Sequence, residues 1–165
     1  QILTQTQWGE LDYLIIDMPP GTGDIQLTLS QKFPVSGAVI VTTPQDIAVA
    51  DARKGIEMFR KVDIPVLGMI ENMSMHICSQ CGHAEHIFGT DGADRLAETY
   101  ETTVLGSLPL STYIREQSDA GTPVVAADDC SEVAMMYRHA ARRLAVALMT
   151  YDAPSVIPDI QITDD

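Results

Sequence analysis

The sequence predicts one α/β domain with three layers, in which helices cover both faces of a mostly parallel sheet. Short apolar segments alternate with stretches of helical periodicity, an order typical of strands joined by right-handed helical crossovers. The apolar segments are nearly continuous in hydrophobicity, as expected of strands that are buried on both faces. A chain of 165 residues with 45% hydrophobic residues can bury one sizeable core.

Four short strands are predicted along the chain. They cover residues 11–17 (LDYLIID), 37–42 (GAVIVT), 66–72 (VLGMIEN) and 103–108 (TVLGSL). Shorter helices are expected after Asp24 and near residues 91–100. A longer helix is expected to begin at Asp46, whose side chain would cap it, and to end at about Lys61. Its predicted buried face consists of Ala48, Ala52, Ile56 and Phe59.

The last predicted helix has the clearest pattern. Asp129 and Glu132 have the spacing of a capping box, with Asp in place of Ser or Thr. Apolar residues then recur at helical spacing, namely Val133, Met136, Tyr137, Ala140, Leu144 and Leu148. We therefore expect one domain over residues 1–150. Residues 151–165, with two prolines and four aspartates, are expected to form a loosely held acidic tail.

The charge of the chain argues against two classes of partner. With 23 acidic and 10 basic residues, the formal net charge is −13. Such a surface repels phosphate backbones and anionic lipids, so neither nucleic acid nor a membrane surface is an expected partner. Three cysteines do not make a disulfide framework and favour a reducing compartment. We therefore expect a cytoplasmic protein.

Residues 73–88 (MSMHICSQCGHAEHIF) hold two of the three cysteines and three of the four histidines, and are expected to form a loop at the carboxyl edge of the sheet. Cys78 and Cys81 can bind one metal ion or two corners of a cluster. Because a closed site needs four ligands, three interpretations remain. The site could be completed as a zinc site by His76, His83 and His86. The pair could be a thioredoxin-like dithiol, or a second copy of the chain could supply its own pair.

Three further positions are singled out. Asp17 ends an apolar strand and begins the turn DMPPGTGD, as a Mg²⁺-binding acid does before a phosphate-contacting loop. The less favoured alternative is an ordinary tight strand-to-helix turn capped by Asp24. Asn72 ends another strand, where a carboxamide can pair with a purine edge or serve a turn. Cys130 lies at a helix start and is expected to be a buried, structural thiol.

The strings IDMPPGTGD, GMIENMS with HICSQCG, IFGTDGA, and GSLPL with IREQSDAGTP together resemble the Mrp/ApbC family of iron–sulfur cluster carriers. The resemblance covers residues 12–147. It implies the deviant Walker A P-loop NTPase fold that the family shares with MinD and nitrogenase iron protein. It also implies ATP binding and a [4Fe–4S] cluster that is transferred to apo iron–sulfur proteins.

The resemblance also implies roles for individual residues. Asp17 matches the switch acid near Mg²⁺ and Gly21 lies by the γ-phosphate. Asn72 matches an asparagine that contacts the base, with the main chain near Pro109 beside the same base. The cysteine pair at residues 78 and 81 matches the motif that bridges a cluster between the two subunits of a homodimer.

One family motif, the glycine-rich G-K-G-G-V-G-K-[ST] loop, is absent from the 165 residues. The sequence contains no Gly-Lys pair, and the loop is expected upstream of Gln1, on a central strand and its following helix. The fold expected here is therefore a partial P-loop NTPase domain without ATPase activity of its own. Two alternatives are a zinc-stabilised interaction module without turnover and a MinD- or ParA-like positioning ATPase, although the acidic tail disfavours the latter.

Overall fold

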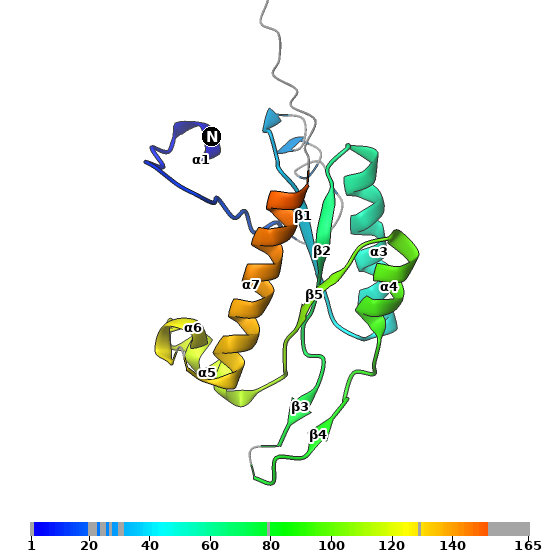
Figure 1. Ribbon diagram of the computed structural model, residues 1–165, viewed down its shortest axis with the longest axis vertical. Coiled ribbons are helices and arrows are strands. Elements are labelled where there is room, and N and C mark those ends of the chain that lie inside the picture. The colour runs from blue at the N-terminus through cyan, green and yellow to red at the C-terminus, as the bar shows by residue number, and fades with distance from the viewer. Residues whose placement is uncertain are drawn as a thin grey trace, which may run out of the picture.

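The computed structural model describes residues 2–19, 23, 26, 28, 29, 32–78, 80–128 and 130–151. A parallel sheet lies at the centre of these residues, with the strand order β1-β2-β5 (Figure 1). It consists of β1 (Ala38–Thr42), β2 (Val66–Glu71) and β5 (Val104–Ser107). The predictions for residues 37–42, 66–72 and 103–108 are confirmed to within one residue at each end.

Helices cover both faces of this sheet, as predicted. Figure 1 shows α3 (Asp46–Lys61) and α4 (Gly92–Tyr100) on one face and α7 (Glu132–Thr150) on the other. The core between the sheet and the first two helices is centred on Met69, Ile56 and Leu96, which are almost completely buried. Burying side chains of this size contributes roughly 1.5–3 kcal/mol each. The α/β fold with three layers is therefore confirmed.

The bounds of α3 agree with the sequence, but its cap does not. The N-cap is Gln45, and Asp46 is the first helical residue. The Asp46 carboxylate instead accepts a hydrogen bond from Arg95 of α4 at 3.2 Å. Of the predicted buried face, Ala52 and Ile56 are buried, whereas Ala48 and Phe59 are half-buried. Val49 and Met58 complete the buried face of α3.

The start of α7 likewise differs from the prediction. Ser131 is the N-cap, and its hydroxyl accepts a hydrogen bond from the backbone N–H of Ala134 at 3.2 Å. The predicted cap Asp129 lies outside the described residues. Further along α7, Ala140 packs closely on β5, since a Cβ added at Gly106 would lie 2.9 Å from its Cβ. Glycine at position 106 therefore lets the helix approach the sheet.

Residues 11–17 do not form the predicted strand. They follow α1 (Ile2–Gln5) as an exposed segment in which the Ile15 side chain is 81% exposed. A parallel strand takes its backbone hydrogen bonds from a neighbouring strand, and no described residue provides one here. The apolar run is thus present without the partner that would bury it.

Two other predictions fall partly on residues that the structure leaves undescribed. The helix expected after Asp24 has helical backbone at residues 26, 28, 29 and 32, with gaps between them. The acidic tail is described only at Tyr151. No helix within the described ranges is long and apolar enough to cross a membrane.

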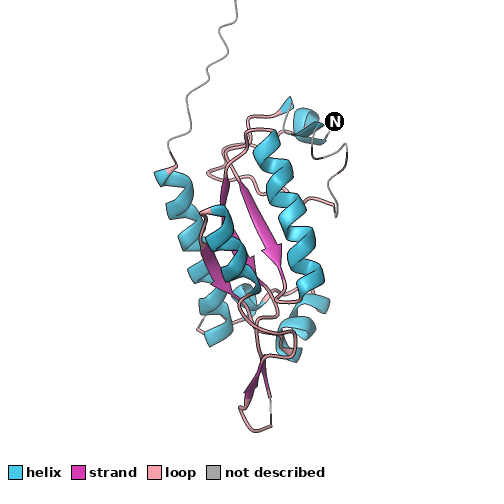
Figure 2. Ribbon diagram, turned by 90° about the vertical axis from the view of Figure 1, so that its right-hand side faces the viewer, coloured by secondary structure: helices cyan, strands magenta, loops and turns pink. Residues whose placement is uncertain are grey.

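The chain between β5 and α7 contains α5 (Thr112–Asp119) and α6 (Val124–Ala127). The segment between β2 and α4 is more than the loop that the sequence predicts. It contains an antiparallel hairpin of β3 (His76–Ile77) and β4 (Ala84–Glu85). Figure 2 shows this hairpin projecting away from the rest of the molecule, and in Figure 1 it follows the carboxyl end of β2. We refer to residues 74–88 as the cysteine hairpin.

Candidate functional site

The carboxyl ends of the three parallel strands are joined by backbone hydrogen bonds. The N–H of Asn72, directly after β2, donates to the carbonyl oxygen of Thr42 at 2.7 Å. The N–H of Leu108, directly after β5, donates to the carbonyl oxygen of Glu71 at 2.8 Å. Ligands of open α/β sheets bind at this edge. The structure therefore brings the predicted residues Asn72 and Pro109 to neighbouring strand ends.

The carboxamide of Asn72 is held on one side only. Its Oδ1 accepts a hydrogen bond from the N–H of Met73 at 2.9 Å. Met73 has a φ of 55°, a left-handed conformation that costs a non-glycine residue about 1 kcal/mol. Within the described residues, the Nδ2 amide of Asn72 has no acceptor, so this group can donate to a ligand. The side chain serves a turn, as one sequence interpretation held, and the N–H groups of its amide are left for other acceptors.

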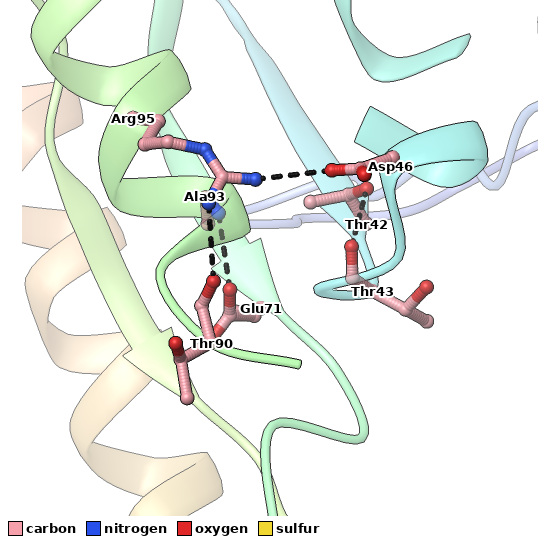
Figure 3. Close-up of polar contacts among 7 residues, drawn as sticks. All are labelled: Thr42, Thr43, Asp46, Glu71, Thr90, Ala93 and Arg95. Atoms are coloured by element: carbon pink, nitrogen blue, oxygen red, sulfur yellow. Dashed lines mark hydrogen bonds and ion pairs between the residues drawn. The ribbon is translucent and has the colours of Figure 1, made fainter. Parts of the chain in front are cut away.

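Glu71 is a buried carboxylate that the sequence interpretation missed. The residue is 6% exposed, and its Oε1 accepts a hydrogen bond from the N–H of Ala93 at 3.0 Å (Figure 3). Ala93 is in the first turn of α4, whose own N-cap, Asp91, makes no side-chain cap bond. Glu71 therefore caps α4 from the end of β2. The sequence signal that could have indicated this role is a charged residue at the end of an otherwise apolar strand, VLGMIE.

Figure 3 also shows Arg95, which joins the first turns of α3 and α4. Its guanidinium donates to Asp46 at 3.2 Å and to the carbonyl oxygen of Thr90 at 3.4 Å. Both charged side chains are exposed, so this pair contributes at most about 1 kcal/mol. Together with Glu71, it fixes the start of α4 next to the strand ends.

The structure does not bring Asp17 into this group of strand ends. Asp17 is exposed and ends the unpaired segment of residues 11–17. Within the described residues, its carboxylate is in no ion pair and remains available to a cation. Gly21 lies outside the described residues.

Cys78 and Cys81 lie together at the tip of the cysteine hairpin. The turn is closed by hydrogen bonds from the N–H of Cys78 to the carbonyl oxygen of His83 at 2.9 Å and from the N–H of Gly82 to that of Cys78 at 2.8 Å. The sulfur of Cys78 accepts hydrogen bonds from the backbone N–H of Gln80, which has the largest effect, and from the backbone N–H and the thiol of Cys81. These bonds hold the pKa of the Cys78 thiol below its ordinary value. The tip therefore favours a thiolate, which is the form that binds metals.

The histidines of the hairpin do not gather around the cysteines. Nδ1 of His76 lies 3.3 Å from the carbonyl oxygen of Leu110, and Nδ1 of His86 lies 2.8 Å from that of Ser74. No group of three or more His, Cys, Asp or Glu side chains in the described part of the chain is arranged to hold a metal ion. The zinc site completed by His76, His83 and His86 is therefore not formed in this structure.

Cys130 is exposed, so the prediction of a buried structural thiol is wrong. Its backbone N–H donates to the Asp128 carboxylate at 3.1 Å in the turn before α7. Cys130 directly precedes Ser131, the N-cap of α7, and so lies in an exposed turn outside the helix.

Comparison with known proteins identifies the family. A model described as the NUBPL iron-transfer P-loop NTPase matches residues 1–145. The chain belongs to this family. An iron–sulfur cluster carrier protein of Pseudomonas fragi is 64% identical over 141 residues, which is 86% of this chain and 49% of that protein. The iron–sulfur cluster transfer protein NUBPL of Mus musculus is 58% identical over 141 residues, again 86% of this chain and 44% of that protein.

The chain thus spans about half the length of these relatives. Among solved structures, it resembles a nucleotide-binding protein from Archaeoglobus fulgidus in complex with ADP, with a TM-score of 0.61 and 43% identity over 69% of this chain and 47% of that chain. The MinD cell division protein of Aquifex aeolicus has a TM-score of 0.62 at 22% identity, covering 84% of this chain and 55% of that one. The predicted family and the partial P-loop NTPase fold are both confirmed.

Proposed function

We propose that this NUBPL-family chain is the cluster-binding part of an iron–sulfur carrier that holds a [4Fe–4S] cluster between two copies of itself and passes it to apo iron–sulfur proteins. The observation that carries the proposal is the position of Cys78 and Cys81. Both thiols lie at the tip of a projecting hairpin, where backbone N–H groups favour the thiolate. Cluster ligands in proteins are commonly thiolates of this kind.

The number of ligands favours two copies. A [4Fe–4S] cluster takes four protein ligands, and each tip offers two thiols. The described part of one chain brings no third His, Cys, Asp or Glu to them. The tip projects from the body (Figure 2), an arrangement that suits contact with a second tip across a two-fold axis. One homodimer would then supply four thiolates to one cluster.

Nucleotide binding is proposed for the longer protein of which such chains form about half. Asn72 would contact the base through its Nδ2 amide, with the main chain at Pro109 beside it. Asp17 would hold Mg²⁺, to which its exposed carboxylate is suited, and Gly21 would lie by the γ-phosphate. ATP binding and hydrolysis would change how tightly two subunits hold the cluster. The Archaeoglobus fulgidus protein in complex with ADP supports this part of the proposal.

The alternatives are less well supported. A zinc-stabilised module needs two more ligands, and two of the three hairpin histidines make hydrogen bonds to backbone carbonyls instead. The likeness to MinD is a likeness of fold alone. With a net charge of −13, the chain also lacks the basic character expected of a membrane-associated positioning ATPase. Free cysteines are typical of proteins in a reducing compartment, which supports the proposal of a cytoplasmic protein.

Metal analysis after anaerobic reconstitution tests the proposal. The protein is incubated with iron and sulfide, desalted, and assayed for iron, acid-labile sulfide and zinc. We expect iron and sulfide in equal amounts, at about two of each per chain. Cys78→Ala and Cys81→Ala should each abolish this content, whereas Cys130→Ala should keep it. Binding of zinc without sulfide would instead support the zinc-stabilised module.

A further inference from the structure

The outgoing strand of the cysteine hairpin is fixed to the chain that follows β5. The N–H and the hydroxyl of Ser74 both donate to the carbonyl oxygen of Leu108, at 2.9 and 3.1 Å. The N–H of Leu110 donates to the carbonyl oxygen of Met75 at 2.8 Å, and His76 forms a parallel bridge with Leu110. This side of the hairpin therefore continues the pairing of β2 with β5.

The returning strand has far fewer contacts. Within the described residues, its ladder with the outgoing strand consists of two pairs, His76 with Glu85 and Ile77 with Ala84, followed by the hydrogen bond from the N–H of Cys78 to the carbonyl oxygen of His83. Such a short two-stranded hairpin is marginally stable in water without additional packing. Residues 80–87 are all exposed, so apolar burial contributes little to holding them.

His86 closes the base of the hairpin. It directly follows β4, and its Nδ1 lies 2.8 Å from the carbonyl oxygen of Ser74 on the opposite strand. Through Ser74, which is buried and bonded to Leu108, the ring is connected to the fixed side of the hairpin. The tip with Cys78 and Cys81 lies beyond this closure, so its direction depends on the base.

We infer that His86 is a positioning residue for the cysteine pair: its ring ties the returning strand to Ser74 and thereby orients Cys78 and Cys81 for cluster binding. This inference rests on the proposed function for the role of the cysteines. It assigns no ligand role to His86, because no group of three or more His, Cys, Asp or Glu side chains in the described residues is arranged to hold a metal ion.

Three variants of the full chain test the inference. His86→Ala removes the ring, and His86→Asn keeps a donor N–H close to the position of Nδ1. His83→Ala is the matched control, because His83 is an exposed histidine of the same hairpin and contributes only its backbone carbonyl to the turn. The measurements are hydrogen–deuterium exchange of peptides within residues 74–88 in the metal-free protein and the decay of the cluster absorbance after reconstitution.

We expect His86→Ala to speed both exchange in the hairpin and cluster loss by roughly threefold to tenfold, the effect of one hydrogen bond. His86→Asn should restore both rates, and His83→Ala should leave both unchanged. Equal rates for His86→Ala and the wild type would overturn the inference. So would a loss of iron without faster exchange that Asn does not rescue, because His86 would then be a ligand. If the wild type takes up no iron and sulfide, the proposed function fails. The exchange rates then still decide whether the His86 ring holds the returning strand to Ser74.

Discussion

The Glu71 carboxylate at the end of β2 accepts a hydrogen bond from the backbone N–H of Ala93 at 3.0 Å and so caps α4 from another element. We predict that Glu71→Ala lowers the free energy of unfolding by about 1–2 kcal/mol, as loss of a helix cap does. Glu71→Gln should cost less, because the side-chain carbonyl remains an acceptor. Urea unfolding followed by circular dichroism measures both values.

Glu98→Ala is the matched control for this prediction, since Glu98 is an exposed glutamate of the same helix. Its effect should stay within about 0.5 kcal/mol. If the alanine substitutions at residues 71 and 98 lower the free energy of unfolding by the same amount, Glu71 does not act as the cap.

The second prediction concerns the pH at which Cys78 becomes reactive. Hydrogen bonds from Gln80 and Cys81 lower the pKa of Cys78 in the folded chain. The thiolate therefore stabilises the fold above the pKa of the unfolded chain, and this contribution is lost as the pH falls through the lower, folded pKa. Alkylation of Cys78, followed by peptide mass spectrometry, should have its midpoint at a lower pH in the folded chain than in urea.

The backbone N–H of Gln80 is the largest cause of this shift. Gln80→Pro removes that N–H and should move the midpoint towards the unfolded value. Gln80→Ala keeps the N–H and should leave the midpoint in place. A midpoint that is the same in the folded chain and in urea would contradict the proposed hydrogen bonding.

The third prediction concerns the turn between β2 and the cysteine hairpin. Met73 has a φ of 55°, which glycine adopts without strain. Met73→Gly should therefore leave stability unchanged or raise it by up to about 1 kcal/mol. Met75→Gly, two residues on at a position without a positive φ, should lower stability by about 0.4–1 kcal/mol, because glycine gives the unfolded chain more conformational entropy to lose. Thermal unfolding of both variants checks this, and equal losses would mean that position 73 is not strained.

The fourth prediction is that the 165-residue chain alone does not hydrolyse ATP. It contains no Gly-Lys pair and so lacks the lysine loop that binds the β- and γ-phosphates. Phosphate release should equal that of a control without protein. Release above this control that disappears in Asp17→Ala would contradict the prediction.

The elements that the sequence predicted correctly are those whose surroundings are complete within the chain. The strands at residues 38–42 and 66–71 pair with each other, and α3 packs on both, so hydrophobic pattern and environment agree. Residues 11–17 have an equally apolar pattern, but the described chain offers them no neighbouring strand. A pattern specifies which face a strand would bury, whereas its pairing depends on residues elsewhere.

The candidate site was predictable where chemistry resides in a short motif, as in Cys78-Ser-Gln-Cys81. It was not predictable where it depends on contacts between distant segments. Glu71 caps a helix that begins 21 residues later, and His86 bonds to Ser74 across the hairpin. Cys130 was predicted to be buried because cysteines commonly are, yet the turn that carries it lies on the surface.

The proposed function depends on two chains sharing one cluster through Cys78 and Cys81. Native mass spectrometry of the anaerobically reconstituted protein tests it most directly, because it counts chains, irons and sulfides in one complex. We expect a dimer with one four-iron, four-sulfide cluster in the wild type and in Cys130→Ala, and monomers without a cluster in Cys78→Ala and Cys81→Ala. A complete cluster on a single chain, or one retained when both cysteines are replaced, would contradict it.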